Sequence, residues 1–421
     1  MYVVPKGTKD VLPSESYKWR YIENAVKKTA ALFSLKEIRT PSFEHTELFL
    51  RGVGGTTDIV NKEMYTFNDK SGRSITLKPE GTAGVARSVI ENSLCGGALP
   101  LKMFYISPVF RYERPQAGRL REHHQFGVEI YGADTAECDV EVMLIVKTFF
   151  DGLGLKNIVA RINSIGCREC RPKYNKALVE YYSDKTDGLC GDCRQRIDKN
   201  PLRLLDCKNP ECKRLSPPKI TDYLCDDCAV RFAAVKRLLS ELDIAYEEDA
   251  NIVRGLDYYT GIVFEFVDKR IGAQSTVCGG GRYNALAEEL GGAKTPAVGF
   301  GIGLERLLLT LEADGLLDGV EDNKPAVYLA PVGEGASVRC MSLVKRLRDA
   351  GVSAETDILG RSLKAQMKYA DKIGCKYTAV IGGDEMADNI YVLKNMTTHA
   401  VSRVADAELE KFFEKEENKI I

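Results

Sequence analysis

The chain has 421 residues, and at roughly 150 residues per domain this length predicts about three domains. Hydrophobic residues make up 44% and charged residues 28%, which is the balance of a globular protein without a bias to disorder. Because 59 Lys and Arg stand against 60 Asp and Glu, total charge gives no argument for a nucleic-acid partner.

Two kinds of targeting segment are absent from the sequence. No stretch reaches the roughly eighteen consecutive apolar residues that a membrane helix needs. Residues 1–10 also lack the apolar centre of a signal peptide. We therefore expect a cytoplasmic protein that does not enter a membrane.

The first 166 residues alternate helical stretches with strand-like runs. Tyr17–Phe33 predicts a helix, and Leu101–Tyr112 predicts a strand. This pattern indicates a mixed α and β domain over residues 1–166, which resumes over residues 229–318 after an insertion.

Two strand-like runs flank an arginine-rich loop between Phe110 and Ile130. In the second run the period of two places Gln125, Gly127 and Glu129 on one face, where the glycine would leave room for a substrate. The loop region holds four arginines, at positions 111, 114, 119 and 121. A guanidinium group can donate two parallel hydrogen bonds to the oxygens of one phosphate. One interpretation of the loop is therefore a binding site for a polyphosphate or an RNA backbone. An amphipathic hairpin with a solvated charged turn is the other.

A cysteine-rich insertion is predicted over residues 167–228. Thirteen cysteines without an export signal argue against disulfides, and eight of them form close pairs in this segment. The spacing suits zinc held by four thiolates, with a nested pair of sites as the preferred arrangement. Eight reduced cysteines in a packed insertion are the alternative. The proposed ligands are Cys167, Cys170, Cys190, Cys193, Cys207, Cys212, Cys225 and Cys228.

Three short motifs follow the insertion. Arg254–Gly261 brings an arginine next to paired tyrosines, although a structural strand with packed tyrosines would look the same. Gly279–Tyr283 requires backbone freedom or the close approach of a ligand, and a plain turn is the alternative. Gly299–Leu307 lacks the glycine spacing of a nicotinamide site. It predicts a glycine-rich strand that leads into a helix, Gly303–Ala313, with Arg306 in the first turn. This arrangement suits the phosphates of a nucleoside triphosphate.

A polar, glycine-containing linker is predicted over Asp314–Lys324. Strands and helices then alternate, which predicts a separate α/β domain over residues 325–421 with a mostly parallel sheet. The runs read as strand, helix, strand, helix, strand, strand over Ala326–Ala330, Ser337–Ala350, Ser353–Thr356, Ser362–Ile373, Tyr377–Ile381 and Ile390–Leu393.

Taken together, these motifs resemble a known family, and the resemblance spans nearly the whole chain. Arg111–Glu129 and Gly299–Leu307 are similar to the second and third signature motifs of class II aminoacyl-tRNA synthetases. Arg254–Gly261 and Gly280–Tyr283 resemble the two signatures of the histidyl enzymes, and Lys78–Thr82 resembles their substrate-binding segment. The segment Lys6–Asp10 fits as well. The resemblance implies an α+β class II catalytic domain with an antiparallel sheet, and a C-terminal α/β anticodon-binding domain.

The resemblance also implies an activity and a role for each matching residue. In the family, ATP activates histidine as histidyl-adenylate, and the histidyl group then passes to the 3′ end of histidine tRNA. Arg111 and Arg254 would hold the α-phosphate and Arg306 the γ-phosphate, while Arg119 and Arg121 would touch phosphates of ATP or RNA. Residues implied to bind L-histidine are Glu80, Thr82, Gln125, Glu129, Tyr258, Tyr259 and Tyr283.

The implied partners and cofactors extend beyond the histidine pocket. Arg114 and Gln116 would contact the acceptor end of the tRNA. Mg²⁺ should accompany the pyrophosphate part of ATP. The family further implies a homodimer formed through the N-terminal catalytic region.

Two other functions compete with this interpretation. The family has a paralogue without charging activity that serves as a regulatory subunit of ATP phosphoribosyltransferase in histidine biosynthesis. The charging pattern disfavours it, since it is intact at Arg111, Gln125, Glu129, Arg254, Tyr258, Tyr259 and Arg306. A cysteine-rich nucleic-acid-binding module without catalysis would leave the glutamate and tyrosine residues unexplained.

Overall fold

The computed structural model describes residues 1–54, 57, 59–207, 209–268, 270 and 276–417. The chain divides into two compact units, Met1–Val320 and Glu321–Ile421, and each is considered by itself. Among the described residues, no helix has both the length and the apolar character needed to cross a membrane.

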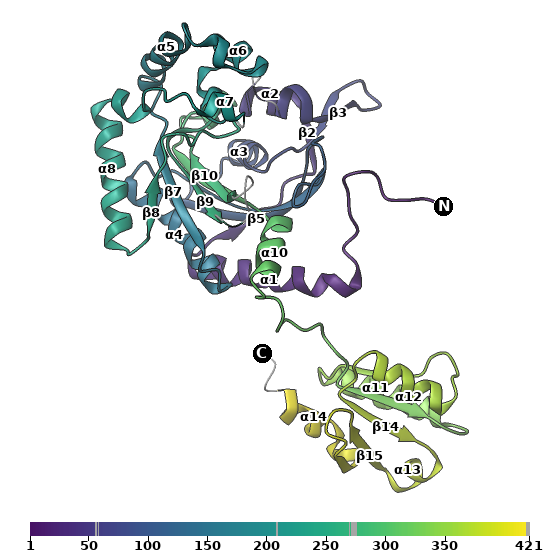
Figure 1. The fold of residues 1–421 in the computed structure, drawn as a ribbon. Helices are drawn as coiled ribbons and strands as arrows, with labels where there is room; N and C mark the ends of the chain where they lie inside the picture. The colour runs from purple at the N-terminus through teal and green to yellow at the C-terminus, as the bar shows by residue number, and fades with distance from the viewer. Residues whose placement is uncertain (55–56, 58, 208, 269, 271–275, 418–421) are drawn as a thin grey trace. The chain divides into compact units, whose positions relative to one another are not determined.

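An eight-stranded sheet forms the centre of the first unit (Figure 1). Its five inner pairings are all antiparallel, and the pairings of the two edge strands are parallel. The expected antiparallel sheet of a class II catalytic domain is therefore confirmed. In spatial order the strands are β1 (Lys36–Glu37), β5 (Leu101–Phe110), β6 (Glu122–Tyr131), β11 (Ala297–Gly303), β10 (Thr276–Arg282), β9 (Thr260–Asp268), β7 (Ile158–Ser164) and β8 (Tyr246–Glu248).

The two faces of the central sheet differ in character, as strand β6 illustrates. Phe126, Val128 and Ile130 are fully buried in the main hydrophobic core, which they share with four helices. The predicted alternation in this strand is confirmed, and the opposite face carries the polar residues Gln125 and Glu129. The helices that share the core are α1 (Pro13–Leu32), α4 (Ala136–Gly152), α8 (Asp226–Glu241) and α10 (Leu304–Ala313).

Smaller elements complete this part of the first unit. A three-stranded antiparallel sheet has β4 (Ser74–Leu77) between β2 (Phe43–His45) and β3 (Tyr65–Asn68). Three short helices and a helical turn accompany it: α2 (Thr46–Gly52), η1 (Ile59–Glu63), α3 (Thr82–Glu91) and η2 (Leu94–Gly96). Helix α9 (Leu286–Glu289) follows β10.

The cysteine-rich segment contains short helices and turns, with no strand among its described residues. Its buried side chains belong to the same hydrophobic cluster as Tyr258, Tyr259 and Tyr283. The segment therefore packs directly on the polar face of the sheet. Its helical elements are α5 (Cys170–Tyr182), η3 (Thr186–Gly188), α6 (Gly191–Arg196), η4 (Pro201–Leu204), α7 (Pro210–Lys213) and η5 (Ile220–Tyr223).

The second unit is an α/β domain with its own core and a five-stranded sheet. Its strand order is β13 (Ala354–Thr356), β12 (Val327–Pro331), β14 (Tyr377–Ile381), β15 (Ile390–Asn395) and β16 (Val401–Ala405). Its helices are α11 (Ala336–Asp349), α12 (Leu363–Lys372), α13 (Gly383–Asp388), the turn η7 (Asp406–Glu408) and α14 (Leu409–Glu417).

The expectation of a mostly parallel sheet in this unit holds for β13, β12 and β14, which pair in parallel, but not for the pairings of β14 with β15 and of β15 with β16. β15 and β16 form an antiparallel hairpin. Its turn is closed by the Asn395 side chain, which accepts hydrogen bonds from the backbone of Thr397 and Thr398 at 2.9 Å each. This local side-chain bond favours a tight reversal of the chain over a crossover connection.

Candidate functional site

A cavity of about 330 Å³ opens on the polar face of the central sheet. Its walls come from segments far apart in the sequence, including β6, β9, β10 and β11 and the residues just before β9. Nine of the residues expected at a substrate site line it: Glu80, Thr82, Arg111, Arg119, Gln125, Arg254, Tyr258, Tyr259 and Arg306.

The carboxyl group of Glu129 is fully buried and does not line this cavity, but it bonds to two residues that do. Its Oε1 accepts hydrogen bonds from the hydroxyl groups of Thr82 at 2.7 Å and Tyr105 at 3.2 Å. Its Oε2 accepts a third bond from the Tyr283 hydroxyl group. These three hydrogen bonds hold the carboxyl group in a single orientation.

Burial also changes the protonation of Glu129. Desolvation raises its pKa from 4.5 to about 8, although the hydroxyl groups of Tyr283 and Thr82 oppose the rise. This shift favours the protonated form of the Glu129 carboxyl group. A ligand that brings an N–H group or a positive charge to this position would favour its ionised form.

Three tyrosine rings form an aromatic wall beside this carboxyl group. The ring centroids of Tyr258 and Tyr259 are 4.7 Å apart, and that of Tyr283 lies 5.6 Å from Tyr258. All three side chains are buried. The ring planes of Tyr258 and Tyr259 are inclined by 45°, and those of Tyr258 and Tyr283 by 67°. The hydroxyl groups of Tyr258 and Tyr283 donate to Glu80 and Glu129, so aromatic faces lie beside polar groups, which suits a small aromatic ring with polar edges.

Glu80 is held by the first turn of α3. Its two carboxylate oxygens accept hydrogen bonds from the backbone of Thr82 and Ala83, each at 2.8 Å, and Tyr258 donates a further bond at 3.2 Å. Burial raises the pKa of Glu80, while these backbone N–H groups act in the opposite direction. A fixed carboxyl group at the cavity wall can receive an ammonium group.

Arg254 crosses the cavity wall above Gly279. Its guanidinium group pairs with Glu265 on the neighbouring strand and lies 5.7 Å from the centroid of the Tyr259 ring. A Cβ atom at position 279 would occupy the space of this guanidinium group. The close approach predicted for the glycine run therefore serves a side chain of the chain itself.

Arg111 and Arg306 border the same cavity from two other elements. Arg111 follows β5, and its Nε donates to the carbonyl oxygen of Pro79 at 2.7 Å. Arg306 is in the first turn of α10, as predicted, and donates to the carbonyl oxygen of Thr276 at 2.6 Å. Burial lowers the pKa of Arg306, and the charge of Arg119 adds to this effect. An anion between these arginines would relieve their mutual repulsion.

Five of the expected contact residues are not among those that line this cavity: the buried Glu129 and Tyr283, and Arg114, Gln116 and Arg121. Arg121 is not among the lining residues of this cavity; its guanidinium group stacks on the Tyr112 ring at 3.8 Å and donates to the backbone of Glu113 at 3.3 Å. Arg114 and Gln116 are exposed on the loop between β5 and β6. They face solvent, where a large partner could reach them.

The interpretation of Gly127 as room for substrate is wrong. Tyr105 is opposite Gly127 in the register of β5 and β6, and its ring fills the space that a Cβ atom would need. The missing side chain thus makes room for a ring that carries a hydrogen-bond donor to Glu129. Only the pairing of β5 with β6 reveals this contact, because Tyr105 lies outside the motif that contains Gly127.

Sequence reasoning also missed other residues of the cavity: Tyr105, Glu113, His123, Asp206, Glu265 and Thr276. Of these, His123 could have been found, because the period of two places it on the same face of β6 as Gln125. Burial lowers its pKa to about 3, with the nearby charge of Arg111 as the next cause, so its imidazole is neutral.

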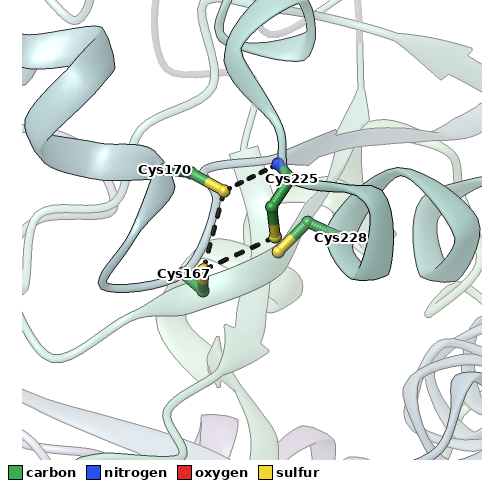
Figure 2. Close-up of side chains that lie close together, drawn as sticks. All are labelled: Cys167, Cys170, Cys225 and Cys228. Atoms are coloured by element: carbon green, nitrogen blue, oxygen red, sulfur yellow. Dashed lines mark hydrogen bonds between the residues drawn. The ribbon is translucent and has the colours of Figure 1, made fainter.

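The eight cysteines of the insertion form two clusters of four. The outer cluster joins Cys167 and Cys170 to Cys225 and Cys228, and Figure 2 shows their side chains converging. The inner cluster joins the pair Cys190 and Cys193 to the pair Cys207 and Cys212. Within each cluster all sulfur atoms lie within 4.8 Å of one another. This is the nested arrangement that the spacing predicted.

The distances within the clusters suit a tetrahedral ion. Zinc–sulfur bonds of about 2.3 Å place the sulfur atoms of a tetrahedral site about 3.8 Å apart. The sulfur of Cys167 lies 3.6 Å from that of Cys170 and 3.8 Å from that of Cys225, and Cys190 lies 3.8 Å from Cys207. The donor set and its spacing therefore fit zinc.

Comparison with known protein families gives two matches. Residues 7–167 and 216–307 match the model of the family described as histidyl-tRNA synthetase. Residues 326–416 match the model described as anticodon binding domain.

Individual relatives match over nearly their full length. A histidine–tRNA ligase of Caldanaerobacter subterraneus subsp. tengcongensis is 54% identical over 409 residues, covering 97% of this chain and 98% of the relative. The structure of apo S. aureus histidyl-tRNA synthetase is 40% identical with a TM-score of 0.84, covering 98% of this chain and 100% of that one.

A third likeness is more distant. The structure described as an ATP phosphoribosyltransferase regulatory subunit/histidyl-tRNA synthetase from Bacillus halodurans C is 22% identical with a TM-score of 0.65, covering 91% of this chain and 99% of that one. At this identity the likeness shows the fold alone.

Proposed function

The chain belongs to the histidyl-tRNA synthetase family, and from this premise we propose that its cavity condenses L-histidine with ATP and then charges histidine tRNA. The activity is that of an ATP-dependent histidine–tRNA ligase, which forms AMP and pyrophosphate. The observation that carries the proposal is the meeting of Arg111, Arg254 and Arg306 in one cavity, whose lining residue Thr82 donates to the buried Glu129.

The first step requires alignment more than covalent help from the protein. The histidine carboxylate attacks the α-phosphorus of ATP, an O–P bond forms, and the bond to pyrophosphate breaks. Negative charge then accumulates on the phosphate oxygens, and fixed cations stabilise it. We assign Arg111 and Arg254 to the α-phosphate and Arg306 to the γ-phosphate. Arg119 borders the same cavity and would meet the outer phosphates.

Recognition of histidine requires a polar group matched to the imidazole N–H. Glu129 and Tyr259 are proposed to read the imidazole, since a buried acceptor left without its partner costs about 1–3 kcal/mol and so rejects other side chains. Glu80, Thr82 and Gln125 would hold the α-ammonium group. Tyr258 and Tyr283 would complete the wall.

The second step brings the tRNA to the adenylate. A ribose hydroxyl group at the 3′ end attacks the histidyl carbonyl carbon, the ester forms, and AMP leaves. Arg114 and Gln116 are exposed on the loop between β5 and β6 and are proposed to contact the acceptor end. Arg121 remains assigned to a phosphate of ATP or RNA, which it would reach by leaving the ring of Tyr112.

The domains divide this work. We propose a catalytic domain over residues 1–166 and 229–318, the insertion over 167–228, and an anticodon-binding domain over 325–421. The two core clusters that serve the first and last of these do not share residues. The acceptor end and the anticodon of the tRNA would therefore each have a separate binding surface.

Two metal cofactors are proposed. Mg²⁺ binds through substrate phosphates and one or two carboxylates, and Glu113 and Glu265 border the cavity where the phosphates would lie. When bound, it would neutralise charge on the departing pyrophosphate. Zinc is the structural metal proposed for the two cysteine clusters, because four thiolates at these distances match its tetrahedral coordination.

We propose that the protein assembles as a homodimer through its N-terminal catalytic region. Its proposed location is the cytoplasm, where ATP, histidine and tRNA occur together. Sedimentation should give twice the mass of one chain. A monomeric mass at micromolar concentration would refute the proposed dimer.

The regulatory-subunit alternative is disfavoured by two observations. Full-length similarity at 54% identity is to a histidine–tRNA ligase, whereas the likeness to the structure whose name includes a regulatory subunit reaches 22%. Six of the seven residues of the charging pattern also line one cavity, all except the buried Glu129.

Histidine-dependent exchange of pyrophosphate into ATP tests the proposed function. Wild-type protein should catalyse it, and Glu129→Ala should raise the KM for histidine by about tenfold or more, because a buried polar partner is lost. The matched control is Glu414→Ala, an exposed residue of α14. An unchanged KM in Glu129→Ala would refute the imidazole assignment, and the absence of exchange in the wild type would refute the function.

A further inference from the structure

The inner cysteine cluster adjoins the proposed active site. Cys207 and Cys212 line a cavity of about 450 Å³ that shares Asp206 and three other lining residues with the catalytic cavity. The three others are Val253, Glu265 and Thr276. Three of the four inner cysteines also belong to the same hydrophobic cluster as Tyr258 and Tyr259.

The segment between the two inner cysteine pairs contacts the loop that carries Arg254. This segment runs from Arg194 to Asp206. The Arg203 guanidinium group donates to the backbone carbonyl oxygen of Arg254 at 3.0 Å, and the Asn200 side chain donates to Asp257 at 3.2 Å. The segment from Arg194 to Asp206 therefore contacts the loop at both Arg254 and Asp257.

The inner cluster holds both ends of this segment in turn. Cys193 is fully buried immediately before it, and Cys207 follows Asp206 directly. Backbone N–H groups donate to the cluster sulfurs, from Cys190 to Cys212 at 3.2 Å and from Asn209 to Cys207 at 3.4 Å. An ion bonded to all four sulfurs would close the segment into a short loop and reduce its freedom to move.

We propose that the inner cluster binds one Zn²⁺ and that this ion, through Asn200 and Arg203, positions the Arg254–Tyr259 loop for binding histidine. The inference rests on the proposed function and deepens it, because it makes substrate affinity depend on a metal outside the catalytic cavity. The inner cluster lies between residues 167 and 216, where neither segment of the family match extends.

The inner cysteines on either side of the segment do not touch the reacting groups. Asn200 and Arg203 are positioning residues, since they act on the loop and not on the reacting atoms. The outer cluster has a different task. It joins the start of the insertion to the first turn of α8, whose N-cap is Cys225.

The test uses full-length protein purified without chelators and two measurements, zinc per chain by mass spectrometry and the Kd for histidine by calorimetry. Wild-type protein should hold two zinc ions. Cys190→Ser should hold one, and its Kd for histidine should rise about tenfold. Cys190 is chosen because it lines neither cavity, so an effect on Kd must pass through the metal site. Removing zinc from the wild type with a chelator should raise Kd likewise, and adding zinc should restore it.

Three further variants separate positioning from general damage. Arg203→Met should keep two zinc ions and still weaken histidine binding, because it cuts the link to the loop and leaves the cluster intact. Cys228→Ser should lose the outer ion with a smaller change in Kd. Cys95→Ser lies outside both clusters and should leave both measurements unchanged.

The outcomes distinguish the inference from the function on which it rests. Wild-type protein without a zinc ion that Cys190→Ser removes, or an unchanged Kd in both Cys190→Ser and Arg203→Met, would overturn the inference alone. Wild-type protein that neither binds histidine nor exchanges pyrophosphate would overturn the proposed function and the inference with it.

Discussion

At the scale of single residues, Glu129 links stability to pH. Its carboxyl group titrates near pH 4.5 in the unfolded chain and at about pH 8 in the folded one, because burial disfavours the ionised form. Between pH 4.5 and about pH 8 the carboxyl group is ionised in the unfolded chain but still protonated in the folded one. The folded state therefore loses stability as the pH rises from about 4.5 to about 8.

Glu129→Gln should remove this pH dependence, since the amide does not titrate. Measured by chemical unfolding without histidine, the variant should gain at least about 1 kcal/mol relative to the wild type between pH 5 and pH 8.5, because one pKa unit corresponds to about 1.36 kcal/mol. Equal pH dependence in the two proteins would contradict the raised pKa. Asp151→Asn, an exposed carboxylate in α4, is the control.

Gly279 is a second residue whose role depends on close packing. Gly279→Ala should displace the Arg254 guanidinium group and lower kcat/KM for pyrophosphate exchange at least about tenfold. In a double-mutant cycle, Arg254→Ala combined with Gly279→Ala should be no worse than Arg254→Ala alone. Gly152→Ala, where an added Cβ meets no atom within 4 Å, serves as the control. Full additivity of the two losses would show that the glycine does not act through Arg254.

At the scale of elements, a buried ion cluster joins β10 to two helices. Asp139 of α4 is fully buried and pairs with Arg282 at the end of β10 at 2.7 Å and with Arg231 of α8 at 2.8 Å. Arg282 is itself 1% exposed. The cluster fixes the strand end directly before Tyr283, so it positions one wall of the proposed histidine pocket.

Removing the central carboxylate would leave two arginines without their anion. Asp139→Asn should therefore lower the free energy of unfolding by about 3–5 kcal/mol, as is typical when one partner of a buried pair is lost. Lys147→Ala in the same helix breaks an exposed pair with Asp151 and should cost less than about 0.5 kcal/mol. Similar losses in the two variants would show that the buried cluster contributes no more than a surface pair.

At the scale of the whole molecule, we propose that the first unit activates histidine and that the second unit binds the anticodon of the tRNA. A protein that ends at Val320 keeps every residue of the catalytic cavity and its core, because both lie in the first unit. It should retain pyrophosphate exchange within about threefold and lose most of its charging of histidine tRNA. Retention of full charging would contradict an anticodon-binding role for the second unit, and circular dichroism would check that the shortened protein folds.

How much of the site could be predicted depended on whether a signal was local. The period of two along β6 predicted which side chains face the core, and the spacing of the cysteine pairs predicted two nested clusters. Arg306 in the first turn of its helix was equally local. Such signals need only the repeat of a strand or helix or a short loop closed by identical residues.

The sequence by itself thus determined the family, the division into a sheet-based unit and an α/β unit, and the residue types of the site. Only the tertiary structure decided that Tyr105 fills the space above Gly127, that Arg254 lies over Gly279, and that Arg203 of the insertion supports the Arg254 loop. These contacts join segments whose proximity depends on strand order and register. No repeat within one segment carries that information, because the pairing of distant strands is set by the packing of the whole sheet.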